Sequence, residues 1–329
     1  MKHHLTRRNV LLLCTILILL AILLVSAVQL VQGLSRVRNQ SAMEYASKTI
    51  VRDGVSYFPR QDITVIMVIG VDRFGPMAGS GYQENSGDAD LVSLLVFDEQ
   101  ARAIQLLSLN RDTMVEMPVL SITGKPAGTK YAQLTLAYNE GSGLEDSCEN
   151  VKKTVSNLLG GVQIDYYIAM NMDAIAILND AVGGVPVTVT EDFSLVDPTI
   201  HMGQMVLNGS QALNYVRARS GVGDQLNLSR MERQNAYIRG LQQALWDGLK
   251  KDAGLLRDLY QDTADYIVTD CSLTTLNTLL NRYDGYTIGE FISLKGENVL
   301  ENQFMAFYPD LQALDDLILQ RFYQRKNTN

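Results

Sequence analysis

The sequence predicts an α/β domain with a mixed central sheet between layers of helices. Apolar, strand-like runs alternate along the chain with amphipathic, helix-like patterns, and this order is typical of that class. Two of the runs are joined by the short turn Asp-Glu-Gln-Ala, which predicts an antiparallel hairpin. A long uncharged segment precedes the domain, so we also expect one N-terminal transmembrane helix.

The N-terminal segment sets the expected location of the protein. The chain of 329 residues has no acidic or basic residue between Arg8 and Arg36, and residues 10–31 are mostly apolar. At about 1.5 Å per residue, these residues span a bilayer core of roughly 30 Å as a helix. We expect a cytoplasmic tail at 1–9, a transmembrane helix at 10–31 and a stalk at 32–60. The large domain then lies outside the cytoplasm on a single-pass anchor in the cell membrane.

A cleaved signal peptide is the competing interpretation of the same segment. Val25-Ser26-Ala27 resembles the small-residue sequence at a cleavage site. The apolar run continues beyond it through Val31, which favours an uncleaved anchor.

The predicted domain covers residues 61–250 and begins with its strands. Residues 62–72 form a continuous apolar run ending in Gly-Val-Asp, which is typical of a strand buried on both faces. A loop rich in Gly, Ser and polar residues follows at 73–89. Residues 91–97 and 103–109 are the two strands of the predicted hairpin.

Helices and strands alternate in the rest of the predicted domain. Ser229-x-x-Glu232 is a capping box, and it predicts a helix with Arg230 at the first helical position. Residues 251–329 form a C-terminal part that packs on the domain or extends it. The elements between are a helix at 144–159 ended by Gly160-Gly161, a strand at 166–170, a helix at 173–182 closed by Gly183-Gly184, and a strand at 185–189.

Composition argues against several classes of protein. Outside residues 1–32 the chain carries 25 Lys and Arg against 36 Asp and Glu, a net charge of −11, whereas general nucleic-acid binding needs a basic face. His201 is the only histidine beyond the N-terminal tail, which excludes a multi-histidine zinc site. Cys148 and Cys271 fit either one disulfide or two free, buried thiols.

Two aspartates flank the glycine-rich loop. Asp72 ends the first predicted strand and Asp90 begins the next, so adjacent strands bring them together at one sheet edge. Two carboxylates beside a flexible loop suit Mg²⁺, a hard cation that prefers oxygen and keeps waters for a substrate phosphate. Capping or turn aspartates, which are common at strand ends, are the alternative.

Arginines cluster in the second half of the domain. The planar guanidinium fork matches phosphate and carboxylate oxygens two at a time, so such a cluster predicts a site for a dense anion. An extended segment would place Arg217 and Arg219 on one face, and a capped helix start at Arg230 suits a phosphate. A solvated basic face paired with neighbouring acids is the alternative. Within 23 residues the cluster contains Arg217, Arg219, Arg230, Arg233 and Arg239.

Arg111 follows the second strand of the predicted hairpin, in the sequence Asn-Arg-Asp-Thr. We expect it to emerge at the same sheet edge as the two aspartates. A surface ion pair with Asp112, worth at most about 1 kcal/mol, is the alternative.

The chain resembles the LytR–CpsA–Psr family of membrane-anchored cell-wall proteins from about Ile63 to Arg239. The order and spacing of seven landmarks carry the resemblance. They are VIGVD (68–72), DADLVSLLVFD (88–98), LSLNRDT (107–113), AYNEG (137–141), LNDAVGGVPVTV (178–189), LNGSQALNYVRAR (207–219) and NLSRMERQ (227–234).

The resemblance implies an anchored, extracytoplasmic enzyme of cell-wall assembly. It would transfer a glycopolymer from a polyprenyl-pyrophosphate carrier to peptidoglycan by metal-assisted phosphoryl transfer, with pyrophosphatase activity as a side reaction. The apolar carrier requires a hydrophobic slot, which we expect between the sheet and its helices. Nucleic acid is not an expected partner.

The resemblance also implies roles for individual residues. Asp72 and Asp90 would bind Mg²⁺ or Mn²⁺. Arg111, Arg217 and Arg219 would be catalytic. The residues implied to bind pyrophosphate are Arg111, Lys130, Arg217, Arg219, Arg230 and Gln234.

Two residues depart from the family pattern. Asp88 stands where many members have an arginine, which removes a phosphate contact and adds negative charge near the metal. Asn227 stands where many have an aspartate, and an amide cannot act as a base; Asp224 lies in the same loop. These departures keep open a non-catalytic envelope sensor or glycan-binding regulator. A glycosyltransferase using Asp88-Ala89-Asp90 as its metal motif is a weaker alternative, because no nucleotide-sugar pool is expected outside the cell.

Overall fold

The structure of the chain, a computed structural model, describes residues 48–77, 87–223 and 227–325. The predicted cytoplasmic tail, the predicted transmembrane helix and the first part of the predicted stalk lie outside these residues. Within the described ranges, no helix has both the length and the apolar character needed to cross a bilayer. The chain forms two compact units, Met1–Pro59 with Arg325–Asn329, and Arg60–Gln324.

In the first unit, the described residues form a β-hairpin. β1 (Ile50–Arg52) pairs antiparallel with β2 (Val55–Pro59). The turn residues Asp53 and Gly54 have φ of 52° and 74°, which is the conformation that Asp-Gly favours in a two-residue hairpin. Part of the segment predicted as a stalk is therefore a strand pair.

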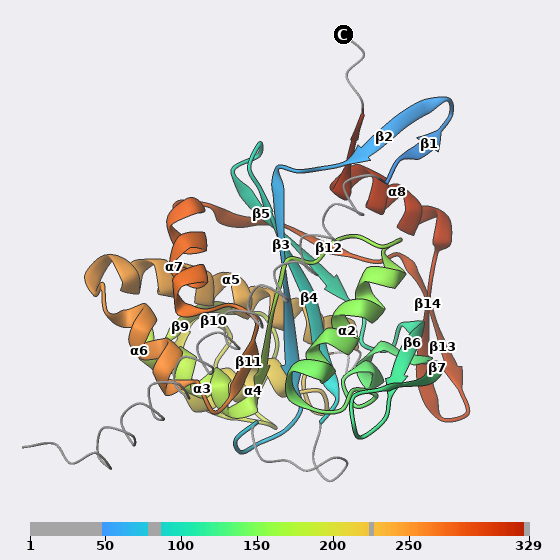
Figure 1. Cartoon of the computed structure of the whole chain (residues 1–329). Coiled ribbons are helices and arrows are strands. Elements are labelled where there is room, and N and C mark those ends of the chain that lie inside the picture. The colour runs from blue at the N-terminus through green and yellow to red at the C-terminus, as the bar shows by residue number, and fades with distance from the viewer. Residues whose placement is uncertain (1–47, 78–86, 224–226, 326–329) are drawn as a thin grey trace, which may run out of the picture. The chain divides into compact units, whose positions relative to one another are not determined.

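The second unit is built on a six-stranded sheet (Figure 1). In order across the sheet, its strands are β11 (Ile267–Thr269), β8 (Tyr166–Asn171), β3 (Ile63–Val71), β4 (Ala89–Asp98), β5 (Ala103–Leu109) and β12 (Thr287–Ser293). β3 is parallel to β8 and antiparallel to β4, while β5 is antiparallel to β4 and parallel to β12. β11 is antiparallel to β8. The predicted mixed sheet and the predicted β4–β5 hairpin are confirmed, and both edge strands come from the C-terminal part.

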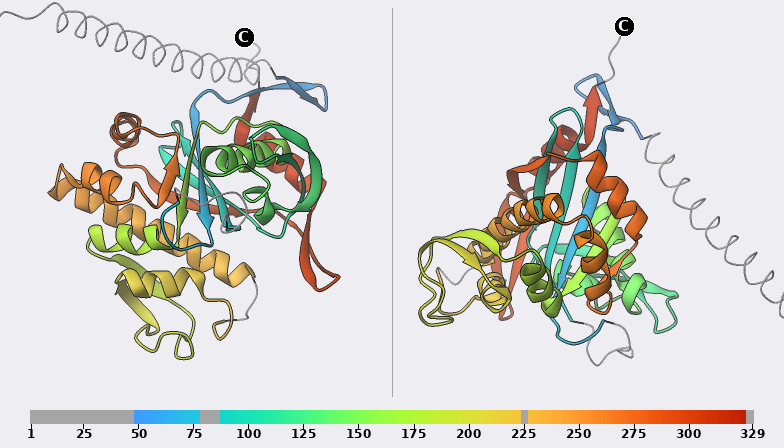
Figure 2. Two further views of the ribbon diagram at one scale, coloured as in Figure 1. Left: turned by 60° about the horizontal axis from the view of Figure 1, so that its bottom comes forward. Right: turned by 90° about the vertical axis from the view of Figure 1, so that its left-hand side faces the viewer.

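Helices cover the two faces of this sheet (Figure 2). Tyr167 of β8 lies 5.6 Å, ring centroid to ammonium, from Lys152 on one face. Its neighbour Ile168 lines a cavity on the other face. Because alternate residues serve two layers, the central strands are apolar along their whole length. The helices are α2 (Leu144–Leu158), α3 (Met172–Ala181), α4 (Gly209–Arg217), α5 (Asn227–Lys251), α6 (Leu255–Asp262), α7 (Leu273–Arg282) and α8 (Leu311–Phe322).

Glycine pairs end the two helices that the sequence predicts at 144–159 and 173–182, and both helices are confirmed as α2 and α3. Gly183 and Gly184 have φ of 82° and 97°, which residues with a side chain rarely adopt. The remaining elements are β6 (Met114–Leu120), β7 (Pro126–Gln133), the 3₁₀ turn η1 (Leu134–Ala137), β13 (Gly296–Glu301), β14 (Phe304–Pro309) and β15 (Tyr323–Arg325).

The strand predicted at 185–189 forms but does not join the central sheet. As β9 (Val185–Val189), it pairs antiparallel with β10 (Gly203–Leu207) in a separate two-stranded sheet. That sheet packs with α4 and α5 around a second apolar core, in which Phe193 stacks on Tyr215 with 5.5 Å between ring centroids. The domain therefore has a satellite core beside its main one.

The segment that carries Arg217 is helical, so the predicted extended segment is wrong. α4 starts at a capping box: the Gln211 main-chain N–H donates to the Asn208 side chain, and the Asn208 main-chain N–H donates to the Gln211 side chain. Arg217 is the last helical residue, and Ala218 leaves the helix with φ −53° and ψ 133°. Arg217 and Arg219 therefore flank a helix end.

Ser229 does not cap α5, so the predicted capping box there is also wrong. α5 begins at Asn227, and Arg230 is its fourth residue. The Asn227 side chain accepts a hydrogen bond from Arg230 at 2.8 Å, which joins the first helical residue to the next turn.

Both cysteines of the described chain, Cys148 and Cys271, are buried and form no disulfide. The disulfide alternative is therefore wrong. Burial raises the pKa of the Cys148 thiol, with the Glu145 and Glu149 carboxylates adding to the shift.

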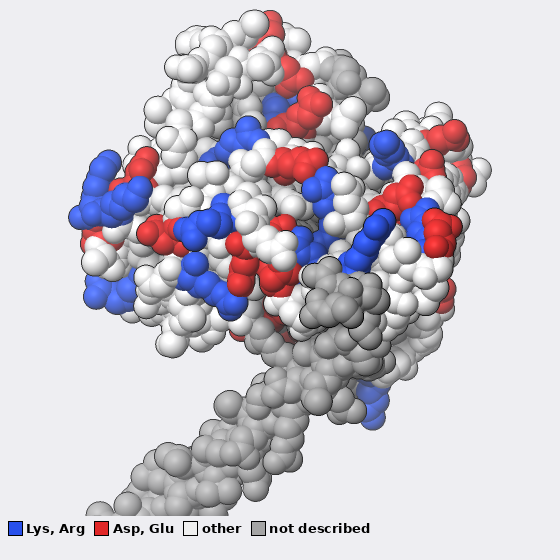
Figure 3. Space-filling view, turned by 90° about the horizontal axis from the view of Figure 1, so that it is seen from above, with Lys and Arg blue, Asp and Glu red and all other residues white. Residues whose placement is uncertain are grey.

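Charged side chains of both signs are mixed on the face shown in Figure 3, among the coloured, described residues.

Arg60 forms ion pairs with two aspartates just before β3. It contacts Asp62 and Asp98 with one 2.7 Å ion pair each, and the Asp98 side chain is only 6% exposed. Hydrogen bonds from the Arg60 guanidinium hold the pKa of both carboxyls below its usual value.

We expect Arg60→Ala to lower the free energy of unfolding by roughly 3 kcal/mol at pH 7, because it leaves a buried carboxylate unpaired. A depressed carboxyl pKa stabilises the fold above the unfolded value of about 4 and ceases to do so as pH falls through the folded value. The difference between variant and wild type should therefore shrink below about pH 4. Urea denaturation measures both effects.

Arg257→Ala is the matched control for this measurement. Arg257 is 62% exposed and pairs with Asp258 on the surface, so its loss should cost less than about 1 kcal/mol. Equal losses for the two variants would contradict the role given to Arg60.

Candidate functional site

The site lies where β3 ends and β4 begins. A β-bulge interrupts their ladder: Gly70 pairs with Leu91 and Val71 with Ala89, so Asp90 has no partner on β3. A bulge of this kind redirects the extra residue's side chain. The main-chain N–H groups of Asp72 and Asp90 both donate to the Asp88 carbonyl, at 2.9 and 3.0 Å. The structure thus brings the two predicted metal aspartates together.

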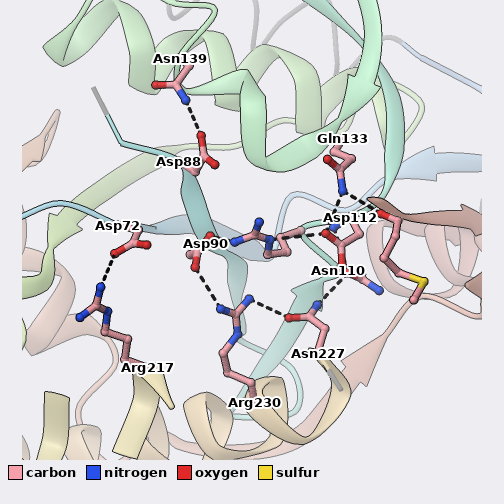
Figure 4. A network of polar contacts seen from close by, with 12 residues as sticks. Asp72, Asp88, Asp90, Asn110, Asp112, Gln133, Asn139, Arg217, Asn227 and Arg230 are labelled. Atoms are coloured by element: carbon pink, nitrogen blue, oxygen red, sulfur yellow. Dashed lines mark hydrogen bonds and ion pairs between the residues drawn. The ribbon is translucent and has the colours of Figure 1, made fainter. Parts of the chain in front are cut away.

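Arginines from two helices reach these aspartates (Figure 4). Arg217, at the end of α4, lies 3.5 Å from the Asp72 carboxylate, and its guanidinium stacks 5.3 Å from the Phe74 ring centroid. Arg230, in the first turn of α5, donates to Asp90 at 3.0 Å. The site is therefore assembled from the ends of strands and helices.

Arg111 completes the pairing of Asp90. It forms an ion pair with Asp90 and lies only 3.4 Å, through Nε, from Asp112. Asp112 is itself buried and accepts a hydrogen bond from Gln133 at 3.0 Å. The ion pair between Arg111 and Asp112 is therefore present but lies below the surface, and Arg111 pairs with Asp90 as well.

The surroundings of Arg230 disfavour the charged form of its guanidinium. Its side chain is almost fully buried, and burial, with Arg111 and Arg219 nearby, lowers its pKa to about 10. The guanidinium remains protonated at neutral pH, so the lowered pKa reflects mainly the cost of burying its charge, to which the positive potential of Arg111 and Arg219 adds. An anion bound at this place would relieve that potential.

Lys130 is not brought into this cluster. It pairs with Glu140 at 2.6 Å and lies on β7, three residues before Gln133. Odd separations along a strand point to opposite faces, so Lys130 faces away from the side on which Gln133 reaches Asp112. The alignment that implies a phosphate contact at Lys130 is not supported by this geometry.

Two polar residues, Asp88 and Asn227, have contacts that the sequence did not indicate. Asp88 accepts a hydrogen bond from Asn139, which turns its carboxylate away from Asp72 (Figure 4). Asn227 donates to Asn110 at 2.8 Å and accepts from Arg230. Asp224 lies outside the described residues.

An apolar cavity of about 620 Å³ opens at the site. One end is lined by Asp90, Arg217, Arg230 and Gln234. From there the cavity follows α5 to Trp246, which is about 24 Å along a helix at 1.5 Å per residue. Apolar residues of β3, β4 and β8 form one wall, and residues of α3, α5, α6 and α7 form the other. The expected slot between the sheet and its helices is thus present as a cavity.

Among the residues that the structure describes, no group of three or more Asp, Glu, His or Cys side chains is placed to hold a metal. Asp90 lines the cavity, and Asp72 lies next to it at the end of β3. Two carboxylates match a cation that takes its other ligands from water and phosphate.

Stability measurements should separate the two aspartates. Asp90 is 12% exposed and pairs with two arginines, whereas Asp72 is 39% exposed and meets Arg217 only at 3.5 Å. We expect Asp90→Asn to cost roughly 3 kcal/mol, since it leaves Arg230 buried without a carboxylate. Asp72→Asn should cost less than about 1 kcal/mol. Urea denaturation in chelator tests this, and equal costs would contradict the assigned pairing.

Known proteins share this architecture. A crystal structure of a Streptococcus agalactiae protein superposes with a TM-score of 0.66 at 23% identity, covering 82% of this chain and 91% of that one. Bacillus subtilis TagV superposes with a TM-score of 0.61 at 22% identity, covering 80% and 98%. These likenesses show the fold.

Sequence comparison adds a family. The teichoic acid transferase TagU of Oceanobacillus iheyensis, named for transfer from a polyisoprenyl carrier to peptidoglycan, is 29% identical over 238 residues. That match covers 69% of this chain and 65% of the relative, so the chain spans about two thirds of its length. The LytR_cpsA_psr family model matches residues 28–321. With most of its length matched, the chain belongs to the LytR–CpsA–Psr family.

Proposed function

We propose that the protein transfers a glycopolymer from a polyprenyl-pyrophosphate carrier to peptidoglycan. One observation carries this proposal: an apolar cavity about 24 Å long ends at a cluster of arginines and carboxylates. A ligand that fills both parts has a long hydrocarbon tail and a compact anionic head. A prenyl pyrophosphate has that chemistry, and the TagU relative is named for the transfer of such a lipid-linked polymer.

The arginines supply the anion site. Arg217 and Arg219 are exposed at the end of α4, while Arg230 is buried beside Asp90 and Arg111 completes the group. Each guanidinium can turn its fork from a carboxylate to phosphate oxygens, because both groups offer a pair of oxygen acceptors whose spacing matches the fork. We assign Arg111, Arg217 and Arg219 to stabilise charge during transfer, with Arg230 and Gln234 binding the pyrophosphate.

Asp72 and Asp90 would hold a divalent cation, Mg²⁺ or Mn²⁺. Their main chains are tied to one carbonyl oxygen, and their oxygens suit a hard cation. When bound, the cation neutralises charge on the phosphate oxygens. The arginines that now pair with these carboxylates then become free to contact the substrate.

In this reaction the protein mainly positions the attacking hydroxyl and the pyrophosphate. A sugar hydroxyl of peptidoglycan attacks the phosphorus that bears the glycan, the bond to the bridging oxygen breaks, and prenyl phosphate leaves. Asn227 cannot accept the hydroxyl proton; its side chain holds Arg230 and Asn110 instead. Attack by water in place of the sugar would give pyrophosphatase activity.

The same proposal includes the location of the protein. The carrier tail lies in a membrane, and residues 10–31 have the length and apolarity of a single membrane anchor. We place residues 1–9 in the cytoplasm and the domain outside the cell, where peptidoglycan is assembled.

Removal of Arg217 or Arg219 tests the site. We expect Arg217→Ala and Arg219→Ala each to weaken binding of geranylgeranyl diphosphate by about 10- to 100-fold, since each removes charge-assisted hydrogen bonds. Transfer from a lipid-linked glycan should require Mg²⁺ and be lost in Asp72→Asn and Asp90→Asn.

Arg239→Ala is the control, because Arg239 is an exposed arginine of α5 that donates to the Gly289 carbonyl. Wild-type affinity in both site variants would show that the pyrophosphate site is misplaced. Binding without any transfer by the wild type would favour the non-catalytic sensor.

The cavity is tested by filling it. Leu241 of α5 lines the cavity, so Leu241→Trp should reduce binding of a long prenyl diphosphate and leave inorganic pyrophosphate binding unchanged. Leu311→Trp is the control, because Leu311 is 73% exposed on α8. Equal loss of both ligands in Leu241→Trp would mean that the site itself is damaged and the cavity is not the tail site. Mass spectrometry of lipid copurified with each variant gives a second measure.

A further inference from the structure

Arg233 is a buried guanidinium for which the proposed reaction has no use. It is 4% exposed and lies on α5, three residues after Arg230 and therefore on the same face of the helix. A buried arginine needs acceptors for its donors. Which acceptors it has indicates what it does.

Most of its acceptors belong to the end of α4. Arg233 Nε donates to the Tyr215 carbonyl at 3.1 Å, and Nη2 donates to the Ala218 carbonyl. The adjacent Gln234 donates to the Val216 carbonyl at 3.3 Å. The last carbonyls of a helix have no donor within the helix, so two neighbouring side chains of α5 satisfy the orphaned carbonyls of α4.

These carbonyls lie in the segment that presents two arginines of the anion site. Arg217 and Arg219 flank Ala218, whose carbonyl Arg233 holds. One turn earlier on α5, Arg230 reaches Asp90. The same helix face therefore contacts one carboxylate directly and fixes the peptide from which Arg217 approaches the other carboxylate.

A purely structural role is the competing account. Arg233 also pairs with Glu191 and lies 5.7 Å from the ring centroid of Phe193 in the satellite core. A buried ion pair is weak evidence for stabilisation, because desolvation offsets much of the attraction. The Tyr215 and Ala218 carbonyls both point at the Arg233 guanidinium. Its two-pronged fork donates to both at once, whereas the ammonium group of a lysine would not.

We propose that Arg233 is a positioning residue for the diphosphate site: its fork fastens the end of α4 to α5 so that Arg217 and Arg219 face the anion. The proposal rests on the proposed function, which supplies the anion. Arg233 itself touches neither substrate nor metal.

Binding to geranylgeranyl diphosphate by the full-length protein in detergent tests the role. Arg233→Lys keeps the positive charge and loses the guanidinium fork. Its affinity for geranylgeranyl diphosphate, measured well below the unfolding temperature of the variant, should therefore fall by about tenfold. In a protein that already carries Arg217→Ala and Arg219→Ala, Arg233→Lys should cause little further loss, because it acts through those residues. An equal loss in both backgrounds overturns the proposal, as does wild-type affinity in Arg233→Lys. Arg239→Lys, on the exposed face of α5, is the matched control.

Glu191→Gln separates the ion pair from the carbonyl contacts. If the carbonyl contacts matter, this variant should bind the diphosphate within about threefold of wild type, since its amide oxygen still accepts from Arg233. A loss as large as that of Arg233→Lys would assign the effect to the ion pair and overturn the positioning role.

Hydrogen exchange gives a readout that does not depend on the ligand. The Ala218 amide donates to the Asn214 carbonyl at 3.0 Å in the last turn of α4. Arg233→Lys should speed exchange of this amide while leaving the amides of α2 unchanged, because only the end of α4 is released. If wild type fails to bind the diphosphate, the proposed function fails, and exchange at Ala218 still decides whether Arg233 fastens α4. Unchanged exchange overturns the fastening.

Discussion

One main-chain oxygen organises the charged groups of the site. The Asp88 carbonyl accepts hydrogen bonds from the N–H groups of Asp72 and Asp90, and the bulge that frees Asp90 from the ladder makes this possible. The two carboxylates are thereby fixed side by side at the end of a buried strand, whose position is set by the packing of both sheet faces. Arg217 pairs with Asp72, and Arg111 and Arg230 pair with Asp90.

Charge balance follows from that arrangement. The chain is acidic outside its N-terminal segment, yet at this place Arg111, Arg217, Arg219 and Arg230 gather beside the carboxylates of Asp72, Asp90 and Asp112. Burial, with Arg111 and Arg219 nearby, lowers the pKa of Arg230. A buried charge is costly unless it is paired, so these carboxylates offset part of the cost of the arginines. An anion bound among the arginines would add a further partner without needing a basic surface elsewhere.

Sequence patterns predicted the elements whose signals are local. Strand β3, the β4–β5 hairpin and helices α2 and α3 follow from continuous apolar runs, a four-residue turn and terminal glycines. The short helix α4 was missed, although Asn208 and Gln211 offered a capping signal, because its apolar pattern is brief. Ser229 and Glu232 matched the capping-box pattern, but both lie inside α5. The pattern shows that a residue is able to cap a helix, and it does not fix where the helix begins.

Long-range contacts explain the other differences. Five of the predicted site residues lie at or near the ends of strands and helices that meet at one place: Asp72, Asp90, Arg111, Arg217 and Arg230. The position of Lys130 depends instead on the register between β6 and β7, which the sequence does not determine. The acceptors of Arg233 lie at residues 191, 215 and 218, and nothing in its own neighbourhood marks it as buried. Apolar spacing cannot distinguish a cavity wall from a packed core, because both need one apolar helix face.

Helix α7 illustrates what such a wall entails. It has an apolar side, with Leu276, Leu279 and Leu280 lining the cavity, yet none of its residues is fully buried. Ordinary cores are packed as densely as organic crystals, whereas this wall borders empty space along the cavity, although Leu279 also packs against the cluster around Tyr283. A hydrocarbon tail lying there would act as the missing core residues. If the proposed carrier occupies the cavity, the rigidity of this layer would change whenever the lipid leaves, because its tail would form part of the interior of the protein.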